Sequence, residues 1–264
     1  MAFNLDFADK VVLVTGSSSG IGESTAILFA RLGAKVVVHG RSASKVAEVA
    51  LKCSQVSPKH YKPLEVIADV AIEAEVDRMM DQVIAHFNQL DVVVNNAGLG
   101  GGESNASLKE WDDFLNTNLR SCYQISLRAY DLLVKFKGVI INNSSICSLK
   151  PFNHSVSYCV AKAGLDMLTR SLAVLWGPKG IRVNAVNPGQ IQTPIWENAS
   201  GLSPEEREIM WRAVCEKTPV GRQGFPEDIA KAIAFLASSD SGFTTGIMMK
   251  IDGGFLDSPQ LIYD

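Results

Sequence analysis

The sequence predicts a doubly wound α/β fold, with a seven-stranded parallel sheet and helices on both of its faces. Short Val- and Ile-rich runs recur throughout the 264 residues, and continuous apolar runs of this length suit parallel strands that are buried on both faces. Segments with helical spacing separate the runs, and this alternation is typical of the fold class. A glycine-rich turn also stands between the first run and the first helical segment.

The predicted elements follow one another as strand and helix along the chain. Strands are predicted, in order, at residues 11–15, 35–39, 63–67, 92–95, 138–142, 181–186 and 247–251. Helices are predicted between them at residues 21–32, 44–55, 73–87, 108–135, 156–177 and 226–238. Gly33 and Gly177 suit helix ends, Ser107 with Glu110 resembles a capping box, and Pro226 suits the first turn of a helix.

No linker, repeat or low-complexity segment divides the sequence, so we predict one domain over residues 1–264. One segment departs from the alternation. Residues 190–220 follow a strand and mix apolar with polar side chains, and long excursions of this kind are usually lids or binding loops. We therefore predict a substrate flap at about 190–220.

Composition and charge narrow the functional classes. The formal net charge of −3 provides no electrostatic attraction to nucleic acid or to anionic membranes. The first residues include neither a basic segment nor a long apolar one, and no run approaches 18 apolar residues, so we predict a cytoplasmic protein that does not bind a membrane. The five cysteines and four histidines are scattered, which predicts neither a disulfide framework nor a metal site.

The glycine-rich turn covers residues 15–22, with the sequence Thr-Gly-Ser-Ser-Ser-Gly-Ile-Gly. Glycines allow a tight turn and a close approach of the backbone, and the helix N-terminus that follows offers free N–H groups to a phosphate. A strand before the turn and a helix after it are the expected context of such a motif. The segment predicts a dinucleotide site of the Rossmann type.

Tyr158 and Lys162 are four residues apart within a predicted helix, so both side chains project from one face. An ammonium beside a phenol favours the phenolate and lowers the phenol's pKa, which would make Tyr158 a general acid or base near neutral pH. Ser145, thirteen residues before Tyr158, could hold a carbonyl oxygen nearby. Cys147 and Cys159 flank these residues. We interpret them as packing residues or, alternatively, as thiols whose oxidation disturbs the site.

Together these motifs resemble those of the short-chain dehydrogenase/reductase family, and in particular an NADP-preferring member. The resemblance rests on the turn at 15–22, Asn-Asn-Ala-Gly at 95–98, Asn118, Ser145, Tyr158 with Lys162, and Asn-Pro-Gly at 187–189. It covers essentially the whole chain, in order and at the spacing of the family. Local features resemble the 3-oxoacyl reductase, tropinone-reductase-like and glucose-dehydrogenase-like branches.

The resemblance implies hydride transfer between a nicotinamide cofactor and a carbonyl or carbinol carbon, with four catalytic residues. Tyr158 exchanges a proton with the substrate oxygen, and Ser145 orients that oxygen. Lys162 lowers the pKa of Tyr158 and binds the nicotinamide ribose. Asn118 holds a water that links Lys162 to solvent.

Two of these assignments have a neighbouring residue as the alternative. Ser144 precedes Ser145, and the thirteen-residue spacing to Tyr158 favours Ser145 because the family has the same spacing. Asn116 lies two residues before Asn118. Asn118 is favoured because the family residue directly precedes an apolar position, as Asn118 does here.

The end of the second strand bears on the choice of cofactor. In NAD-linked relatives an acidic residue ends this strand and binds the ribose hydroxyls. Here Gly40 holds that position and Arg41 follows it. A glycine leaves room for a 2′-phosphate, and a guanidinium can bind that phosphate through paired, charge-assisted bonds. We therefore predict NADP(H), with Ser42 as a further hydrogen-bonding group; a solvated Arg41 without a role in binding is the alternative.

The resemblance further implies that the cofactor lies along the carboxyl ends of the strands. Asp69 would contact the adenine ring, although a helix N-cap is an alternative role for it. Asn95 is expected chiefly to stabilise the sheet. The predicted cofactor contacts are Gly16, Ser18, Ser19, Gly20, Ile21, Arg41, Ser42, Asp69, Val70, Asn96, Ala97, Gly98, Tyr158, Lys162, Pro188, Gly189, Ile191 and Thr193.

The predicted activity is therefore the NADPH-dependent reduction of an apolar ketone or aldehyde. The expected apolar walls of the substrate pocket are Leu99, Leu149, Phe152, Ile195, Trp196 and Trp211. One alternative is an NAD-preferring alcohol or sugar dehydrogenase of the same family. Another is a non-catalytic dinucleotide-binding scaffold, although such proteins usually lose the tyrosine, the lysine or the glycine turn. By analogy with the family we expect a homotetramer, or less often a dimer, paired through the predicted helices at about 108–135 and 156–176.

Overall fold

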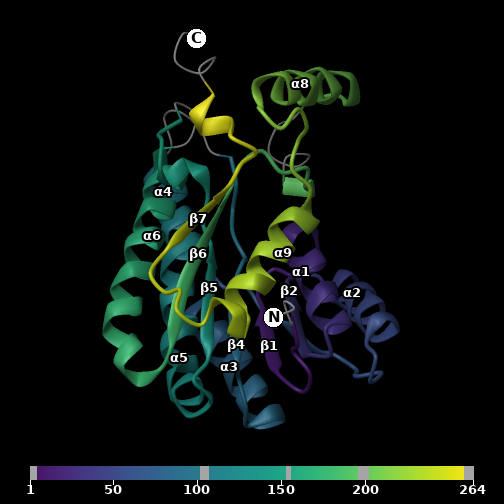
Figure 1. The fold of residues 1–264 in the computed structure, drawn as a ribbon, viewed down its shortest axis with the longest axis vertical. Helices are drawn as coiled ribbons and strands as arrows, with labels where there is room; N and C mark the ends of the chain where they lie inside the picture. The colour runs from purple at the N-terminus through teal and green to yellow at the C-terminus, as the bar shows by residue number, and fades with distance from the viewer. Residues whose placement is uncertain (1–4, 102–106, 153–155, 196–201, 259–264) are drawn as a thin grey trace.

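The computed structural model describes residues 5–101, 107–152, 156–195 and 202–258. Seven parallel strands form one sheet in the order β3-β2-β1-β4-β5-β6-β7, which confirms the predicted fold class (Figure 1). The strands are β1 (Val11–Val14), β2 (Lys35–Gly40), β3 (Leu64–Ile67), β4 (Val92–Asn95), β5 (Val139–Asn143), β6 (Arg182–Pro188) and β7 (Met248–Ile251).

Helices cover both faces of the sheet because the inner strands are apolar on both faces. The helices that cover it are α1 (Gly20–Arg31), α2 (Ala43–Val56), α3 (Glu73–Phe87), α5 (Ser121–Phe136), α6 (Val156–Trp176) and α9 (Pro226–Ala237). Buried side chains of α1, α2 and α9 form one hydrophobic core against the sheet. Those of α3, α5 and α6 form a second core against the opposite face, and Figure 1 shows the two groups on either side of the strands.

The strand order places a crevice at the carboxyl end of β1. The chain runs outward from β1 through β2 to β3 and then returns to pair β4 with the other edge of β1. In open α/β sheets, ligands bind in the crevice that such a reversal of strand order leaves. The segments that follow β1 and β4 are therefore the ones that the fold brings together for binding.

The two edge strands differ from the prediction that all strands are buried on both faces. In β3 only Val66 is buried, whereas Glu65 and Ile67 are exposed. All four residues of β7 are partly exposed. An edge strand has a neighbour on one side only, and helices cover it incompletely, so its apolar run does not require a fully buried position.

The predicted helix at 108–135 is not continuous. It divides into α4 (Leu108–Leu115), a π-helical turn, η1 (Asn116–Arg120), and α5. Such turns are frequent at functional sites, and this one contains Asn118. The sequence signal could not show the division, because a π-turn inserts one residue without disturbing the apolar pattern on either side.

The predicted flap is partly described. Residue Ile191 forms an isolated bridge with Gly224, and the helix α8 (Pro204–Lys217) follows after Ser203 caps its first turn. Among the described residues, α8 buries none of its side chains, and Figure 1 shows it standing apart from the sheet at the carboxyl end of the strands. Trp196, one of the expected pocket walls, lies outside the described residues.

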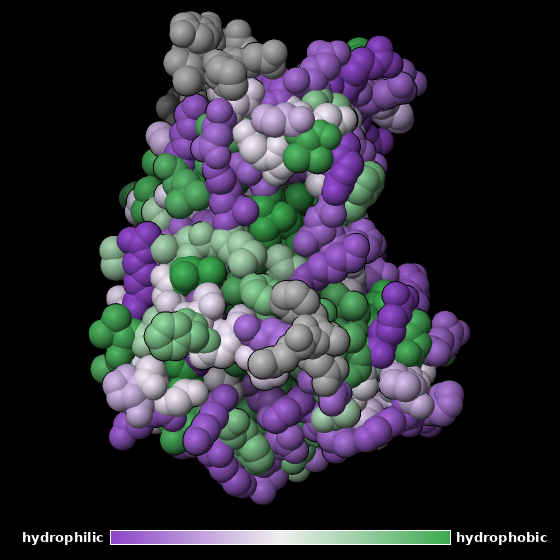
Figure 2. Space-filling model, viewed as in Figure 1, coloured by the Kyte–Doolittle hydropathy of each residue, from purple (hydrophilic) through white to green (hydrophobic). Residues whose placement is uncertain are grey.

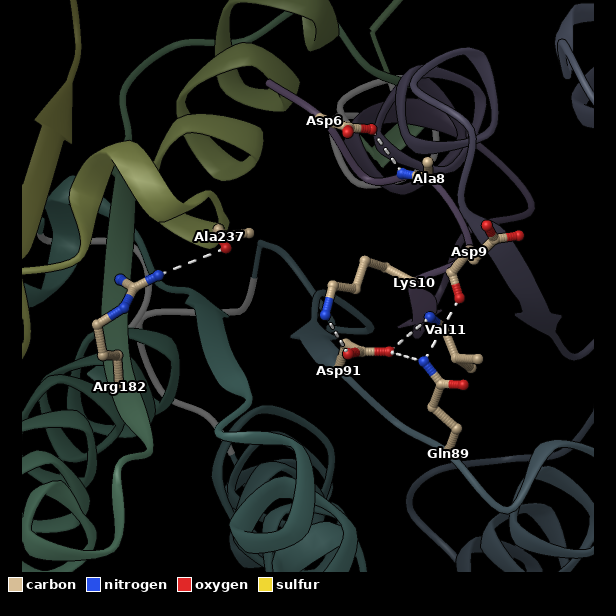
Figure 3. Close-up of polar contacts among 9 residues, drawn as sticks. All are labelled: Asp6, Ala8, Asp9, Lys10, Val11, Gln89, Asp91, Arg182 and Ala237. Atoms are coloured by element: carbon tan, nitrogen blue, oxygen red, sulfur yellow. Dashed lines mark hydrogen bonds and ion pairs between the residues drawn. The ribbon is translucent and has the colours of Figure 1, made fainter. Parts of the chain in front are cut away.

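A buried carboxylate ties the amino end of β1 to the start of β4. Asp91 accepts hydrogen bonds from Lys10 Nζ at 2.9 Å and from the backbone N–H of Val11 at 2.9 Å. Gln89 Nε2 donates a third bond to it at 2.7 Å, and Figure 3 shows these three donors converging on Asp91. The cluster satisfies a carboxylate that the sheet would otherwise leave buried without partners.

We expect Asp91→Ala to lower the free energy of unfolding by about 2 kcal/mol, because it removes charge-assisted bonds and leaves a buried N–H unpaired. Urea denaturation of the variant and of the wild-type protein measures this difference. Asp6→Ala is the control, because the bond that Asp6 accepts from Ala8 N–H is exposed (Figure 3). Equal losses in the two variants would contradict the role of the Asp91 cluster.

Candidate active site

A cavity of about 950 Å³ opens at the carboxyl ends of the strands. The structure brings most of the predicted site residues to its wall, although they come from the loops that follow six strands and from the helices α1 and α6. Those that line it are Gly16, Ser18, Ser19, Gly20, Ile21, Arg41, Asp69, Val70, Asn96, Ala97, Gly98, Ser145, Tyr158, Lys162, Pro188, Gly189, Ile191 and Thr193. Asn118 and Ser42 are not part of the lining.

The glycine turn between β1 and α1 passes close to the loop after β4. Gly16 has a φ of +62°, and a Cβ there would lie 2.7 Å from Cα of Ala97, so this position requires glycine. Within the described chain, the side chain of the N-cap residue Ser19 makes no capping hydrogen bond. The amino end of α1 therefore offers backbone N–H groups to an anion, and it fits a pyrophosphate.

His39 supports this turn, although no role was predicted for it. Its Nδ1 accepts a hydrogen bond from the backbone N–H of Gly16 at 3.0 Å, and its Nε2 lies 3.1 Å from the carbonyl oxygen of Ala68. These partners select a neutral ring that donates from Nε2. Burial lowers the pKa of His39 to about 4. The position of His39 next to Gly40, at the end of β2, is the sequence feature that could have indicated this role.

Protonation of His39 should weaken the folded state in acid. Its pKa is lower in the folded protein than the ordinary value of 6.5, so unfolding takes up a proton between those values and stability rises with pH. The contribution is complete above about pH 6.5 and is lost as the pH falls to about 4; its size is about 3 kcal/mol. We expect His39→Gln to flatten this part of the stability–pH curve in urea titrations, whereas His60→Gln, at an exposed histidine, should leave it unchanged.

The end of β2 is shaped by Gly40. A Cβ at this position would lie 2.6 Å from Oγ of Ser18, so a side chain fits there only if Ser18 moves. The Arg41 side chain is 73% exposed, and its Nη1 lies 3.9 Å from Oδ2 of Asp69. The guanidinium therefore stands at the cavity rim without a tight partner there, and it is available to an anionic ligand. Ser42 lies beside it and contacts Ser44.

Asp69 closes a turn and does not cap the following helix. Its Oδ1 accepts a hydrogen bond from the backbone N–H of Ala71 at 2.9 Å, and its own N–H donates to Glu75 Oε2 at 2.7 Å. The N-cap of α3 is Ile72. The alternative role of Asp69 as an N-cap is therefore wrong, because the chain makes one more turn before the helix begins.

The loop after β4 is held by backbone and amide hydrogen bonds. Thr15 Oγ1 accepts from the backbone N–H groups of Asn96 and Ala97, both at 3.0 Å. Asn96 Oδ1 in turn accepts from Asn143 Nδ2 at 2.8 Å. Asn95 donates to Asn142 on the neighbouring strand at 2.9 Å, which confirms that it stabilises the sheet.

Ser145, Tyr158 and Lys162 meet at the wall of the cavity. Lys162 Nζ donates to the carbonyl oxygen of Asn143 at 2.7 Å and lies 5.6 Å from the centre of the Tyr158 ring. The Ser145 hydroxyl lies close enough to the phenol of Tyr158 to lower the pKa of that phenol. The ring of Phe114 packs edge-on against Tyr158 at a centroid distance of 6.2 Å. The tyrosine is thus fixed with a hydroxyl partner and a nearby ammonium.

The direction of the Tyr158 pKa differs from the expectation. Burial raises the pKa of Tyr158 above its ordinary value, although the Ser145 hydroxyl opposes this rise. Burial likewise lowers the pKa of Lys162. The spacing of the two residues predicted proximity correctly, but loss of solvent disfavours both charged forms and is the largest influence on the pKa of each residue. In this state Tyr158 is a protonated phenol at neutral pH.

Asn118 is fully buried behind the cavity wall. Its Oδ1 accepts from the backbone N–H of Leu99 at 2.8 Å, and its Nδ2 donates to the carbonyl oxygen of the same residue at 3.1 Å. A Cβ on Gly98 would lie 2.7 Å from Asn118 Oδ1 and 3.7 Å from Lys162 Nζ. Asn118 therefore holds the loop that lies next to Lys162.

The apolar part of the cavity agrees only partly with the expected walls. Leu99, Phe152 and Ile195 line it, whereas Leu149 is exposed outside it. Trp211 lines a separate hollow of about 530 Å³ on another side of α8. Ile146, Met210 and Val214 also line the cavity of about 950 Å³, although they were not among the expected walls. Figure 2 shows hydrophobic side chains gathered in the recess below α8.

Cys147 and Cys159 are free thiols near the catalytic residues. Burial raises the pKa of Cys147 to about 11, so its reactive thiolate is disfavoured at neutral pH. No group of three or more metal-binding side chains occurs among the described residues. The described helices also include none that is long and apolar enough to cross a membrane.

Comparisons with known proteins give consistent results over nearly the whole chain. A family model described as enoyl-(acyl carrier protein) reductase matches residues 16–256. The (2S)-[(R)-hydroxy(phenyl)methyl]succinyl-CoA dehydrogenase subunit BbsD of Thauera aromatica is 36% identical, over 93% of this chain and 96% of the relative. The 3beta-hydroxysteroid dehydrogenase 1 of Eggerthella lenta is 37% identical, over 94% of each chain.

Solved structures that are similar to this chain include two ligand complexes. A 7α-hydroxysteroid dehydrogenase complexed with NADH and 7-oxo glycochenodeoxycholic acid is 29% identical, with a TM-score of 0.88 over 96% of this chain and 98% of that one. The L-sorbose reductase of Gluconobacter frateurii, complexed with NADPH and L-sorbose, is 31% identical, with a TM-score of 0.88 over 96% of this chain and 99% of that one. Relatives of this chain thus include complexes with either nicotinamide dinucleotide.

Proposed function

This chain belongs to the short-chain dehydrogenase/reductase family of oxidoreductases, which act on alcohols and ketones, and from that premise we propose that it uses NADPH to reduce an apolar ketone or aldehyde. The observation that carries the proposal is the meeting of Tyr158, Ser145 and Lys162 at one wall of a cavity whose opposite end holds Arg41 and the glycine turn.

Tyr158 is the proposed proton donor to the substrate oxygen. Carbonyl reduction needs a donor that is protonated at neutral pH, and the raised pKa of Tyr158 keeps its proton in place. The Ser145 hydroxyl, which lies beside the phenol, orients the same oxygen. Lys162 supplies positive charge beside the phenolate that would form, and Asn118 holds the neighbouring Gly98–Leu99 loop in place. Bound NADPH would supply the hydride.

The choice of NADPH over NADH rests on the end of β2. Position 40 holds a glycine and not an acidic residue, whose charge would repel a 2′-phosphate. A Cβ at this position would contact Ser18 Oγ, so an acidic side chain would fit only if Ser18 moved. The Arg41 guanidinium stands at the cavity rim with its nearest carboxylate at 3.9 Å. A 2′-phosphate would pair with this guanidinium through charge-assisted bonds.

The proposed substrate is apolar because the wall near Tyr158 is apolar. Leu99, Ile146, Phe152 and Ile195 line that part of the cavity, and Met210 of α8 joins them from the flap. A charged substrate would lose its hydration against these apolar side chains. A bulky ketone or aldehyde fits the surface better than a sugar with many hydroxyl groups.

The test of this proposal is NADPH oxidation followed at 340 nm over a panel of ketones, aldehydes, quinones, sugars and 3-oxoacyl thioesters. We expect turnover on apolar carbonyl compounds, with a higher kcat/KM for NADPH than for NADH. Faster turnover with NADH and sugars would replace the proposal with an NAD-linked sugar dehydrogenase. NADPH binding without turnover on any compound would favour a non-catalytic scaffold.

A second copy of the chain is the proposed partner of the α5–α6 face. Apolar side chains point outward from both helices: Tyr123 and Leu127 on α5, and Val160, Met167 and Val174 on α6. Each helix already contributes a separate buried set to the core, so these exposed residues exceed what folding of one chain requires.

We therefore expect a dimer or tetramer in size-exclusion chromatography with light scattering. Met167→Glu should shift the protein towards smaller species, because it places a charge in the proposed interface. Leu51→Glu, at an exposed apolar residue of α2, is the matched control and should not. A mass of 28.5 kDa for the wild-type protein at micromolar concentration would contradict this proposal.

A further inference from the structure

Asp166 is a buried, charged residue on α6, the helix that carries Tyr158 and Lys162. The proposed reaction gives Asp166 no role. It lies two turns after Tyr158 and one turn after Lys162 on α6, so the three side chains share one face. The residue is only 6% exposed. One oxygen, Oδ2, accepts a hydrogen bond from Asn187 Nδ2 at 3.0 Å. The other, Oδ1, has no hydrogen-bond partner among the described residues.

A carboxylate in this situation is a poor source of stability. Burial removes its hydration, and a single hydrogen bond does not replace what water provided. A polar group that is buried and incompletely satisfied calls for an explanation other than packing. The explanation offered by the contacts is that Asp166 fixes the amide of Asn187, which is itself fully buried at the end of β6.

Asn187 in turn holds the segment that carries Ser145. Its Nδ2 donates to the backbone carbonyl oxygen of Ser145 at 3.0 Å and to Ser148 Oγ at 2.8 Å. Ser148 Oγ donates to the same carbonyl oxygen, at 2.6 Å. Asp166 decides which way the amide of Asn187 faces, because a carboxylate accepts only from the NH₂ side of the amide. The chain of contacts runs from α6 through β6 to the turn after β5.

Asp166 also acts on Lys162 through its charge. The groups that affect the pKa of Lys162 are Cys122 on α5, Cys147 on the turn after β5, and Asp166 on its own helix. Asp166 raises the pKa of Lys162, against the larger effect of burial, which lowers it. The same carboxylate therefore supports the ammonium and orients the turn that holds Ser145.

We propose that Asp166 and Asn187 are positioning residues, which set the Ser145 turn against Tyr158 and maintain the ammonium of Lys162. This inference rests on the proposed reductase function, in which Ser145 and Tyr158 share the substrate oxygen. A displacement of about 1 Å between such groups can lower a rate a hundredfold. Neither residue touches substrate in this role, so neither is a catalytic residue.

Two substitutions at one position separate the hydrogen bond from the charge. Asp166→Leu removes both, whereas Asp166→Asn keeps an oxygen that accepts from Asn187 and removes only the charge. We expect Asp166→Leu to lower kcat/KM for the best carbonyl substrate at least tenfold, with the Kd for NADPH, measured by fluorescence, unchanged within twofold. Asp166→Asn should recover most of this loss near neutral pH.

The pH profile should distinguish Asp166→Asn from the wild-type protein. Without the carboxylate, the protonated form of Lys162 and the neutral phenol of Tyr158 both lose support, because a negative charge stabilises ammonium and destabilises phenolate. The two groups titrate as a coupled pair. We therefore expect the alkaline limb of kcat/KM to move to lower pH by up to about one unit in Asp166→Asn.

Thr169→Val is the matched control, since Thr169 is buried on the same helix and bonds Asn142 and not the Ser145 turn. It should lower the melting temperature but leave kcat/KM within twofold. Hydrogen–deuterium exchange in the cofactor-free proteins gives a readout independent of activity: Asp166→Leu, and not Thr169→Val, should accelerate exchange at residues 147–149.

The outcomes separate this inference from the proposed function. If the wild-type protein reduced no carbonyl compound, the proposed function would be overturned. Faster exchange at residues 147–149 in Asp166→Leu would then still support the positioning role of Asp166. Wild-type turnover with unchanged kinetics, pH profile and exchange in both Asp166 variants would overturn the positioning role. A loss of melting temperature alone, as in Thr169→Val, would also overturn it, because Asp166 would then be merely structural.

Discussion

Tyr158→Phe is expected to lower kcat about 10³-fold while leaving the Kd for NADPH within about twofold, because general-acid catalysis typically contributes 10²- to 10⁴-fold. The substitution removes only the phenolic oxygen, which is the proposed proton donor. The ring and its edge-on contact with Phe114 stay, so the fold and the cavity should be preserved. Single-turnover NADPH oxidation and fluorescence titration measure the two quantities separately.

Tyr130→Phe is the matched control for this result. Tyr130 lies on α5, and its ring packs against Trp176 at a centroid distance of 5.0 Å, away from the cavity lining. It should retain wild-type turnover, since its hydroxyl takes no part in the proposed reaction. Wild-type turnover in Tyr158→Phe, or an equal loss in Tyr130→Phe, would exclude Tyr158 as the proton donor.

The raised pKa of Tyr158 also predicts how the rate of reduction depends on pH. Reduction requires the protonated phenol, and burial holds the pKa of Tyr158 above its ordinary value. The rate of reduction should therefore be nearly constant from neutral pH into the mildly alkaline range and fall only as the pH rises through that raised pKa. A fall already at neutral pH would show that the expected depression of the phenol's pKa by Lys162 prevails when the cofactor is bound.

Arg41→Ala is expected to lower kcat/KM for NADPH by about tenfold to a hundredfold, which corresponds to about 1.4–2.8 kcal/mol, and to leave that for NADH nearly unchanged. The guanidinium is exposed at the cavity rim, so its contribution should also decline as salt concentration rises. Steady-state kinetics with both cofactors at low and high ionic strength test both statements. An equal loss with NADH would show that Arg41 does not recognise the 2′-phosphate.

The companion substitution is Gly40→Asp, which introduces the carboxylate that NAD-linked relatives have at the end of this strand. Combined with Arg41→Ala, it should reverse the preference towards NADH. Gly40→Ala controls for space alone, because any Cβ at this position meets Ser18 Oγ at 2.6 Å. If Gly40→Ala reduced the use of both cofactors equally, the contact with Ser18, rather than charge, would set the limit at this position.

The sequence predicted the elements that have strong local signals. The strand positions, the glycine turn and most helix ends agree with the structure, because each depends on neighbouring residues only. The helix expected at 108–135 was wrong in one respect, since a π-turn at 116–120 interrupts it. The edge strands β3 and β7 were expected to be buried, and the error arose because an apolar run does not reveal whether a neighbour covers it.

The candidate site could be predicted only as a set of residues. Its members lie on the loops after six strands and on the helix α6, and the resemblance to a known family supplied their grouping before any distance was known. His39, Ile146, Met210, Val214 and Asp166 were missed, because no spacing distinguishes a buried histidine, aspartate or wall residue from ordinary packing. Leu149 and Trp211 were included wrongly, since apolar character near a site does not specify which way a side chain points.

The amino-acid sequence by itself determined the fold class, the family and the identities of Tyr158, Lys162 and Ser145, because these depend on residue type and spacing along the chain. The tertiary structure decided how those groups behave. Burial raised the pKa of Tyr158 against the expected direction, and the contact of Asp166 with Asn187 joined a helix to the turn that holds Ser145. Solvent exclusion and contacts between distant segments exist only after the chain has folded, so neither could be inferred from the order of the residues.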